Sequence, residues 1–481
     1  MKDKKMAIKF GTSGWRAVIA EEFTFENVAR VISAIGKYVK AQKKEKNQAE
    51  NIRPKIVVGY DTRFLSKECA RFTAEILAAE NIDVFLADRD VPTPVIAYQI
   101  IKKNADGGIN FTASHNPPEY NGIKFSPAYG GPAPKKATDE IEKIITKNFN
   151  QKSPPQNKPR PIIVFDASRD YLKRLRQLVD IAALKKAKLK IIIDCMHGTC
   201  RGYLDNILQK CTKNIVVLNN DLNPAFGGNP PEPKPAYIKT MIHELRRSRA
   251  HLGLACDGDA DRFGIIDRDG TYINANQVLA LLFEHLIKTR GKMKTVARTL
   301  STTSMIDGIA GYNGMRVIET PVGFKYIGEV LAGGECLIGG EESGGLSIHG
   351  HVPEKDGILA CLLIAEMLAI RGQSIRKILN NLYKKYGYFY NDRIDIALTE
   401  KIKLKLLNKL KTAPPVEFCN LPVKEINTID GFKFILQDQS WVMYRFSGTE
   451  PIVRCYLETI SRNRLKKLRL EARRLIVSNA L

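Results

Sequence analysis

The chain has 481 residues, well beyond the roughly 250–300 at which one hydrophobic core stops growing, so it should divide into several domains. Hydrophobic residues make up 44% and charged residues 26%, a composition typical of folded, water-soluble proteins rather than of long disordered stretches. The 75 Lys and Arg against 51 Asp and Glu give a net charge of +24, but this excess lies in separate segments. Two of them, 401–411 and 462–474, carry apolar residues at helical spacing, so we interpret their charges as solvated helix faces.

Targeting and membrane signals are absent from the sequence pattern. The basic segment 1–17 lacks the apolar run of about 7–15 residues that a signal peptide needs. The most apolar stretch, 358–370, is shorter than the roughly 20 residues that span a bilayer and contains Glu366, so it predicts a buried helix. Nine cysteines, with no Cys-x-x-Cys pair, favour neither a disulfide framework nor a zinc site. We therefore expect a cytoplasmic protein that associates with no membrane.

Short runs rich in Val and Ile alternate with helical patterns along the chain. A strand pattern at 55–61 precedes a helical pattern at 67–80, another at 190–198 precedes 201–211, and a helical pattern within 271–287 precedes the strand pattern 295–300. Continuous apolar strands followed by helices predict α/β layers with buried sheets. The last part of the chain alternates like antiparallel strands before a closing basic helix, which predicts a small α+β domain.

Pro-rich and Gly-rich segments suggest where the domains meet. Candidate linkers lie at 151–161, 267–272 and 384–393. The Pro-rich segment 223–237 has strand and helix patterns on both sides and is interpreted as an excursion within one domain. These signals predict four domains, which span residues 1–156, 157–268, 269–388 and 389–481.

Three aspartates, Asp257, Asp259 and Asp261, alternate with small residues directly after an apolar strand pattern. Three carboxylates this close repel one another unless a cation neutralises them, and oxygen ligands suit a hard divalent ion such as Mg²⁺. A calcium EF-hand is excluded because its sixth and twelfth positions would be Arg262 and Arg268 instead of Gly and Glu. A solvated acidic turn is the remaining alternative.

Ser114 lies in the segment TASHNPP, at 112–118. No Gly-x-Ser-x-Gly elbow surrounds it, and neighbouring side chains on an extended chain diverge, so we expect His115 to be poorly placed as its base. A phosphorylated serine would explain the separate triple-aspartate loop, since a phosphoryl oxygen would complete the ligands of the metal. A surface turn is the alternative.

Two further loops have residue types that bind sugars and phosphates. Glu341 and Ser343, framed by glycines, can accept and donate hydrogen bonds to sugar hydroxyls, although glycine loops with a glutamate are common. The segment 444–458 places arginines and hydroxyl groups around Gly448, which suits a phosphate dianion, with a plain hairpin turn as the alternative. No Gly-x-x-x-x-Gly-Lys-Ser/Thr loop occurs, so nucleoside triphosphate binding of that type is not supported.

In chain order, the motifs FGTSGWRA, TASHNPP, DGDADR, GEESGG and RFSGTEP make the sequence resemble the α-D-phosphohexomutase superfamily over nearly its full length. This resemblance implies a four-domain phosphohexomutase architecture around a central cleft, with three related α/β domains and a C-terminal α+β domain that resembles the TATA-binding protein. The implied catalytic residues are Ser114, Arg16, Lys124 and His115. The implied ligands of Mg²⁺ are Ser114, Asp257, Asp259 and Asp261. The implied sugar-binding residues are Arg262, Gly323, Glu341, Ser343 and Lys355. The implied phosphate-binding residues are Arg445, Ser447, Gly448, Thr449 and Arg454.

The resemblance also implies a reaction in which phospho-Ser114 donates its phosphoryl group to a hexose monophosphate. The resulting 1,6-bisphosphate turns over and returns its other phosphate, with glucose 1,6-bisphosphate as activator. Arg16, Lys124 and Arg262 would stabilise charge or relay protons near the serine. We expect a hexose phosphate as partner, no specific nucleic acid, and a monomer or dimer.

Three positions favour glucose phosphate as the substrate. Gly345 and Phe324 stand where some phosphomannomutase and phosphoglucosamine mutase relatives carry His, and Lys355 lies in an EKDG segment that resembles the phosphoglucomutase branch. Mannose phosphate and glucosamine phosphate remain alternatives, as does net synthesis of hexose 1,6-bisphosphate. A different class of function would be a basic nucleic-acid-binding protein on an inactive scaffold, which salt-sensitive binding without mutase activity would reveal.

Overall fold

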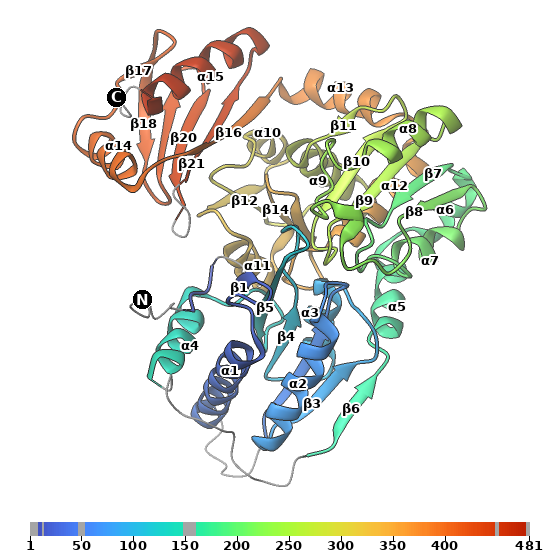
Figure 1. Ribbon diagram of the computed structural model, residues 1–481. Coiled ribbons are helices and arrows are strands. Elements are labelled where there is room, and N and C mark those ends of the chain that lie inside the picture. Colours follow the sequence, from blue (N-terminus) through green and yellow to red (C-terminus); the bar gives the residue numbers. More distant parts are fainter. Residues whose placement is uncertain (1–7, 12–13, 47–52, 148–159, 448–451, 478–481) are drawn as a thin grey trace.

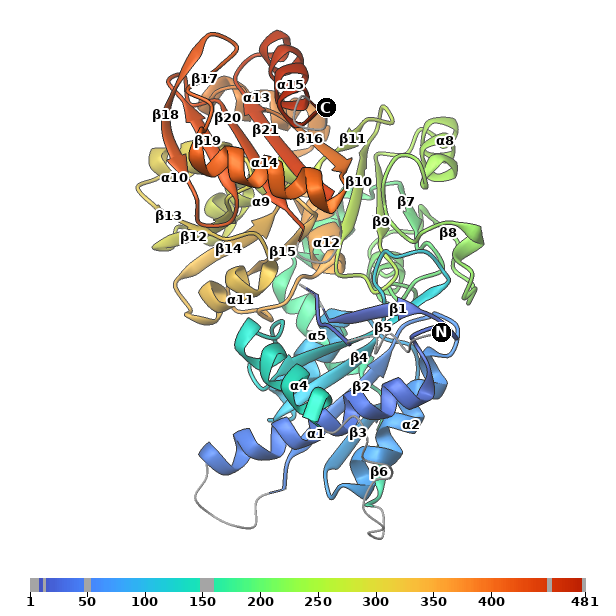
Figure 2. The same cartoon turned by 60° about the vertical axis from the view of Figure 1, so that its left-hand side comes forward.

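The computed structural model describes residues 8–477 except 12–13, 47–52, 148–159 and 448–451. The described residues form four β-sheets, each with its own helices. The sheet built from the third quarter of the chain lies between the N-terminal and C-terminal sheets, and the second sheet lies beside it (Figure 1, Figure 2). The predicted four-domain α/β architecture with a distinct C-terminal α+β domain is confirmed.

The first sheet has the strand order β1-β5-β4-β2-β3-β6. Its strands are β1 (Trp15–Val18), β2 (Lys55–Tyr60), β3 (Asp83–Ala87), β4 (Gly107–Phe111), β5 (Tyr120–Pro127) and β6 (Ile162–Phe165). Its helices are α1 (Phe25–Lys46), α2 (Ser66–Ala79), α3 (Thr93–Lys102) and α4 (Lys135–Lys147). Residues 112–119 join β4 to β5 and contain the predicted serine loop. Strand β6 lies after the domain end expected at 156, yet it pairs with β3 in parallel and so extends this sheet.

The second sheet has the order β11-β10-β9-β7-β8. Its strands are β7 (Ile191–Asp194), β8 (Ile215–Leu218), β9 (Leu252–Cys256), β10 (Phe263–Asp267) and β11 (Tyr272–Ile273). Its helices are α5 (Ser168–Leu178), α6 (Ile181–Ala187), α7 (Leu204–Gln209), η1 (Phe226–Gly228) and α8 (Lys239–Ser248). The three aspartates occupy the turn between β9 and β10. The segment 267–272 is a hairpin turn joining β10 to β11 rather than a linker, because Gly270, at φ 84°, lets the chain reverse within the sheet.

The third sheet has the order β13-β12-β14-β15. Its strands are β12 (Thr295–Thr299), β13 (Arg316–Thr320), β14 (Cys336–Glu341) and β15 (Gly345–Ile348). Its helices are α9 (Ala275–Arg290), α10 (Met305–Tyr312), α11 (Phe324–Ala332), α12 (Gly357–Arg371) and α13 (Ile375–Tyr386). The buried helix predicted at 358–370 is confirmed as α12, whose residues 357–368 are all buried. Among the described residues no single helix has the length and composition to cross a bilayer; α12 and α13 meet those criteria only as a pair bent by 83°.

The C-terminal sheet is antiparallel, with the order β16-β21-β20-β19-β18-β17. Its strands are β16 (Tyr390–Ala397), β17 (Glu417–Phe418), β18 (Leu421–Asn427), β19 (Phe432–Leu436), β20 (Trp441–Phe446) and β21 (Ile452–Thr459). Helices α14 (Glu400–Thr412) and α15 (Arg462–Val477) share one hydrophobic core with the sheet through Leu410 and Leu468. Most of their basic residues remain exposed, which confirms the interpretation of both segments as solvated helix faces. All nine cysteines are free.

Candidate active site

Ser114 is held in a strained, buried turn at the end of β4. Its backbone has φ 53°, in the left-handed region that non-glycine residues seldom adopt. The Ser114 amide donates to Thr112 Oγ1 at 2.8 Å, and the Ser114 hydroxyl donates to Asp257 Oδ2 at 2.8 Å. Only 1% of the serine is exposed, so the surface-turn alternative is excluded.

His115 lies closer to Ser114 than the sequence predicted. The expectation that the two side chains diverge is wrong, because Ser114 is not extended: its left-handed backbone turns Oγ to within 3.3 Å of His115 Nδ1. Burial, reinforced by the positive charges of Arg262 and Arg16, holds the pKa of His115 well below its ordinary value. The imidazole is therefore neutral near pH 7, and a neutral imidazole can accept a proton.

The three aspartates form a compact cluster of oxygens. Asp257, Asp259 and Asp261 are fully buried, and each offers a ligand atom within 4.8 Å of the others. Asp259 Oδ1 and Asp261 Oδ1 are buried without a hydrogen-bond partner. Burial and the two neighbouring carboxylates raise the pKa of Asp257 well above its ordinary value. Orphaned carboxylate oxygens of this kind fit a hard divalent cation, which would satisfy them and relieve the repulsion.

Two lysines converge on the aspartate cluster from other domains. Lys124 Nζ, from β5, lies 2.6 Å from Asp259 Oδ2 and 2.7 Å from Asp261 Oδ2. Lys355 Nζ, from the segment before α12, lies 2.8 Å from Asp261 Oδ2. Burial would lower the pKa of Lys124, but the two aspartates raise it, so its ammonium stays charged. These lysines place positive charge beside the serine and the carboxylates.

Two arginines complete the surroundings of the serine. Arg16, from β1, donates from Nη1 to Asn116 Oδ1 at 2.7 Å, two residues after Ser114. The Arg262 amide donates to Asp257 Oδ1 at 2.9 Å, and its guanidinium lies 3.8 Å from Glu232. The structure therefore brings the predicted residues Arg16 and Arg262 to the serine and aspartate loops.

Glu354 is a buried carboxyl group at this site that the sequence analysis did not single out. It precedes Lys355, whose amide donates to Glu354 Oε1 at 2.9 Å, and only 4% of it is exposed. Burial raises the pKa of Glu354 to about 7, against the opposing charges of Lys355 and Lys124. A carboxyl group that exchanges a proton near neutral pH therefore lies within electrostatic reach of Lys124, the predicted catalytic lysine.

This raised pKa predicts a pH-dependent difference in stability between the protein and Glu354→Gln. Below about pH 4.5 Glu354 is protonated in both states, and its full contribution to the free energy of unfolding is present. Between about pH 4.5 and 7 the unfolded chain releases this proton while the folded state keeps it, so the contribution is lost as the pH rises to about 7. Glutamine has no such loss. Urea unfolding at about pH 5 and about pH 8 should show Glu354→Gln gaining up to roughly 3 kcal/mol over the wild type. The exposed Glu335→Gln is the control, and a pH-independent difference for Glu354→Gln would contradict this prediction.

The predicted sugar loop forms the turn between β14 and β15. Ser343 Oγ donates to Glu341 Oε1 at 2.6 Å, so the carboxylate and hydroxyl lie side by side. A Cβ atom on Gly345 would come within 2.3 Å of the Lys355 side chain, so any larger residue would displace this lysine. Gly323, with φ 133°, caps α11 in a neighbouring loop.

The predicted phosphate turn joins β20 to β21. Arg445 and Arg454 face each other as a register pair on the two strands, and Ser447 donates its amide to the Ile452 carbonyl at 3.0 Å. Gly448 and Thr449 lie outside the described residues.

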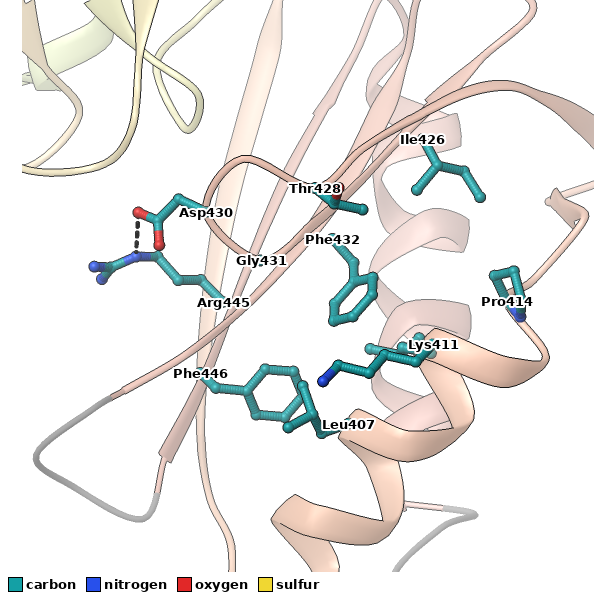
Figure 3. Close-up of a pocket in the computed structure, with 11 residues that line it drawn as sticks. Leu407, Lys411, Pro414, Ile426, Thr428, Asp430, Gly431, Phe432, Arg445 and Phe446 are labelled. Carbon is teal, nitrogen blue, oxygen red and sulfur yellow. Dashed lines mark hydrogen bonds and ion pairs between the residues drawn. The ribbon is translucent and has the colours of Figure 1, made fainter.

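Asp430 connects this turn to the third domain. Asp430 Oδ2 accepts hydrogen bonds from Arg445 Nε and from the Val322 amide, both at 2.9 Å. Figure 3 shows this ion pair at one end of a pocket of about 690 Å³ between α14, the turn 428–432 and the end of β20. None of the serine, aspartate or sugar-loop residues lines the pocket. The candidate active site is therefore defined by the side chains of the serine, aspartate and sugar loops and not by this pocket.

The sequence analysis missed residues whose roles depend on long-range contacts. Arg63 binds the serine loop, Thr93 donates to Asp259 Oδ2, and Asp430 orients Arg445. The sequence signal was weak in each case. Arg63 and Thr93 follow apolar strand patterns by a few residues, and Asp430 precedes a glycine in a hairpin turn.

Comparisons with known proteins agree with this arrangement. Models of the phosphoglucomutase/phosphomannomutase domains match in order: alpha/beta/alpha domain I at 7–152, domain II at 169–270, domain III at 274–386 and the C-terminal domain at 394–475. A phosphoglucomutase/phosphomannomutase of Thermococcus kodakarensis is 30% identical over 462 residues, which cover 95% of this chain and 96% of that protein. A probable phosphoglucosamine mutase of Pyrococcus horikoshii is 30% identical over 472 residues, which cover 98% of each chain.

A solved structure gives the same result in three dimensions. The crystal structure of a candidate phosphomannomutase from Thermus thermophilus matches with a TM-score of 0.84 and 30% identity, covering 98% of this chain and 99% of that one. The relatives carry different substrate names, so they agree on the type of enzyme and not on the sugar. The chain belongs to the phosphoglucomutase/phosphomannomutase family and is a phosphohexomutase, an intramolecular phosphotransferase.

Proposed function

We propose that this enzyme interconverts glucose 1-phosphate and glucose 6-phosphate through a phosphorylated Ser114 and a bound glucose 1,6-bisphosphate. The observation that carries the proposal is the buried Ser114 hydroxyl, 2.8 Å from Asp257 Oδ2 at the edge of the aspartate cluster. A serine in this position can carry a phosphoryl group beside a cation site, which is the arrangement that phosphoryl transfer needs.

Ser114, Asp257, Asp259 and Asp261 are proposed to hold Mg²⁺. When bound, the ion would neutralise negative charge on the phosphoryl group. The two buried carboxylate oxygens without a hydrogen-bond partner and the all-oxygen donor set support this assignment.

The other groups around the serine are proposed to stabilise and deprotonate the reactants. Lys124 and Arg16 place fixed positive charge next to the expected positions of the phosphoryl oxygens. This charge lowers the barrier to phosphoryl transfer, because the groups need not move as the transition state forms. The neutral His115 imidazole lies 3.3 Å from Ser114 Oγ and can accept the proton of the attacking sugar hydroxyl. As the phosphoryl group leaves Ser114, the imidazolium so formed can return that proton to the Ser114 oxygen, which restores the serine hydroxyl and the neutral imidazole.

The loops of the third and fourth domains are proposed to hold the sugar and its other phosphate. Glu341 and Ser343 would bind the sugar hydroxyls, together with Gly323, Arg262 and Lys355. Arg445, Ser447 and Arg454, with Gly448 and Thr449, would bind the phosphate that does not react. A phosphate site that accepts either end of the bisphosphate would let the intermediate turn over and present its other phosphate to Ser114.

The coupling between Asp430 and Arg445 gives a testable prediction. Asp430→Ala should raise KM for the hexose phosphate about 10-fold, because Arg445 loses the charged hydrogen bond that orients it. Steady-state kinetics would measure this change. Asp438→Ala, which removes a carboxylate paired with Arg464 in the same domain, should leave KM unchanged. An unchanged KM in Asp430→Ala would show that the ion pair does not position the phosphate site.

The preference for glucose rests on the contact between Gly345 and Lys355. A side chain at position 345 would displace Lys355. The sugar loop therefore holds Lys355 close to Gly345 and has no room for the histidine that some phosphomannomutase and phosphoglucosamine mutase relatives carry there. Mannose phosphate and glucosamine phosphate are the competing substrates.

Coupled assays with Mg²⁺ and a trace of the matching 1,6-bisphosphate would compare kcat/KM for glucose, mannose and glucosamine 1-phosphates. The proposal predicts the highest value for glucose 1-phosphate. A higher value for another sugar would overturn the glucose assignment while leaving the mutase assignment intact. Accumulation of free bisphosphate in place of the 6-phosphate would instead favour a bisphosphate synthase.

A further inference from the structure

Arg63, in the loop after β2, binds the serine loop through four backbone carbonyl groups. From Nη2 it donates to the carbonyl oxygens of Ser114 at 2.7 Å and Asn116 at 2.6 Å. From Nη1 it donates to those of Pro117 at 2.8 Å and Tyr120 at 2.9 Å. One guanidinium group thus fixes the whole turn between β4 and β5.

Arg63 is itself held rigidly from two domains. Its Nε lies 3.2 Å from Asp61 Oδ2, and the other oxygen of Asp61 accepts hydrogen bonds from the Arg63 amide and from Ser66 Oγ. The Phe226 ring of the second domain lies 4.9 Å from the guanidinium carbon. The Arg63 side chain is fully buried, so none of these contacts is weakened by solvent.

The conformation of Ser114 requires such support. A non-glycine residue in the left-handed region is strained and persists only where its surroundings determine it. On its other side the Ser114 carbonyl packs against Gly258, where a Cβ atom would come within 2.7 Å of the oxygen. The carbonyl is therefore held between the Arg63 guanidinium and the aspartate loop, which fixes the direction of the Ser114 hydroxyl.

We propose that Arg63 is a positioning residue for phosphoryl transfer: it holds the 114–120 turn so that Ser114 Oγ faces the aspartate cluster. This proposal rests on the proposed function, in which Ser114 carries the phosphoryl group. Lysine cannot replace it, because an ammonium is a point charge that could pair with Asp61 but could not span four carbonyl oxygens. Among the described residues, Arg63 forms no hydrogen bond or ion pair with a predicted sugar or phosphate residue, so its effect should fall on the transfer step and not on substrate binding.

The test compares Arg63→Lys and Arg63→Ala with wild type and with Arg89→Lys. Arg89 is a suitable control because it also donates to a backbone carbonyl, that of Arg201, and stacks on an aromatic ring, that of Tyr203, but lies outside the serine loop. Intact-mass spectrometry would follow phosphorylation of each protein by glucose 1,6-bisphosphate, steady-state kinetics would give kcat and KM, and thermal unfolding would report the folded fraction.

Arg63→Lys should stay folded while its phosphorylation rate and kcat fall about 100-fold and its KM changes little, because a small displacement of the reacting oxygen has an effect of this size. Millimolar guanidinium should restore part of the rate in Arg63→Ala, and Arg89→Lys should behave as wild type.

Wild-type rates in Arg63→Lys would overturn the proposal. So would an activity loss that only follows the unfolded fraction and is not rescued by guanidinium. If the wild type itself takes up no phosphoryl group, the proposed function fails first, and that outcome is visible before any variant is compared.

Discussion

Ser114→Ala should lower mutase activity by more than about 10⁴-fold while the protein stays folded. The substitution removes the only oxygen on this side chain that can carry a phosphoryl group, and removal of a covalent nucleophile has effects of this order. The lost hydrogen bond to Asp257 should lower the free energy of unfolding by only about 1–2 kcal/mol. A coupled assay with glucose 1-phosphate, together with thermal unfolding, would measure both effects.

Ser440→Ala is the matched control for this prediction. Ser440 is equally buried and its hydroxyl also donates to a carboxylate, that of Asp438 at 3.0 Å, but it lies in the C-terminal domain. It should lose a similar amount of stability and keep full activity. A Ser114→Ala enzyme that retains more than a small fraction of wild-type activity would show that another group carries the phosphoryl transfer.

Asp259→Asn should abolish activation by Mg²⁺, lowering kcat by about 10³-fold or more, because it removes one of the three carboxylates proposed to bind the ion. It also has a readout that does not depend on activity. Mg²⁺ should raise the unfolding temperature of the wild type, since an ion that binds only the folded state stabilises it, and should raise that of Asp259→Asn much less. Without Mg²⁺, the substitution relieves repulsion between carboxylates but also removes one of the two carboxylate partners of Lys124, so the readout is the shift caused by Mg²⁺ and not the stability without it.

Asp267→Asn separates loss of metal binding from loss of a buried carboxylate. Asp267 is 1% exposed and accepts hydrogen bonds from the amides of Ile375 and Arg376, at the start of α13, at 3.2 and 2.8 Å. Its substitution should lower stability but preserve stabilisation and activation by Mg²⁺. Equal stabilisation of wild type and Asp259→Asn by Mg²⁺ would rule out the aspartate cluster as the ion site.

Much of the fold could be predicted because the strands and helices have strong local patterns. The apolar runs at 55–61 and 190–198 became β2 and β7, and the stretch at 358–370, apolar except for Glu366, became the buried helix α12. The alternating pattern near the C-terminus became an antiparallel sheet covered by the basic helix α15. In each case the local pattern and the tertiary burial favour the same structure.

Sheet edges and connections were harder to predict, because pairing partners are distant in sequence. Strand β6 follows a Pro-rich segment that marked a domain end, yet it pairs with β3, about eighty residues earlier. The segment 267–272 has the composition of a linker and forms a hairpin turn. Composition indicates a reversal of the chain but does not distinguish a reversal within a sheet from one between domains.

The candidate site was only partly predictable for the same reason. The motifs identified Ser114 and the three aspartates, but the assumption of an extended backbone separated His115 from Ser114. No local signal could show that Arg63 would reach four carbonyl groups more than fifty residues away.

Phosphorylation of Ser114 during turnover is the central claim, and intact-mass and peptide mass spectrometry test it most directly. The enzyme would first be incubated with glucose 1,6-bisphosphate and Mg²⁺, and then with glucose 1-phosphate. The account predicts the gain of one phosphoryl group, located on Ser114, and its loss to the sugar at a rate at least equal to kcat. Full mutase turnover without phosphorylation of Ser114, or with the group on another residue, would contradict it.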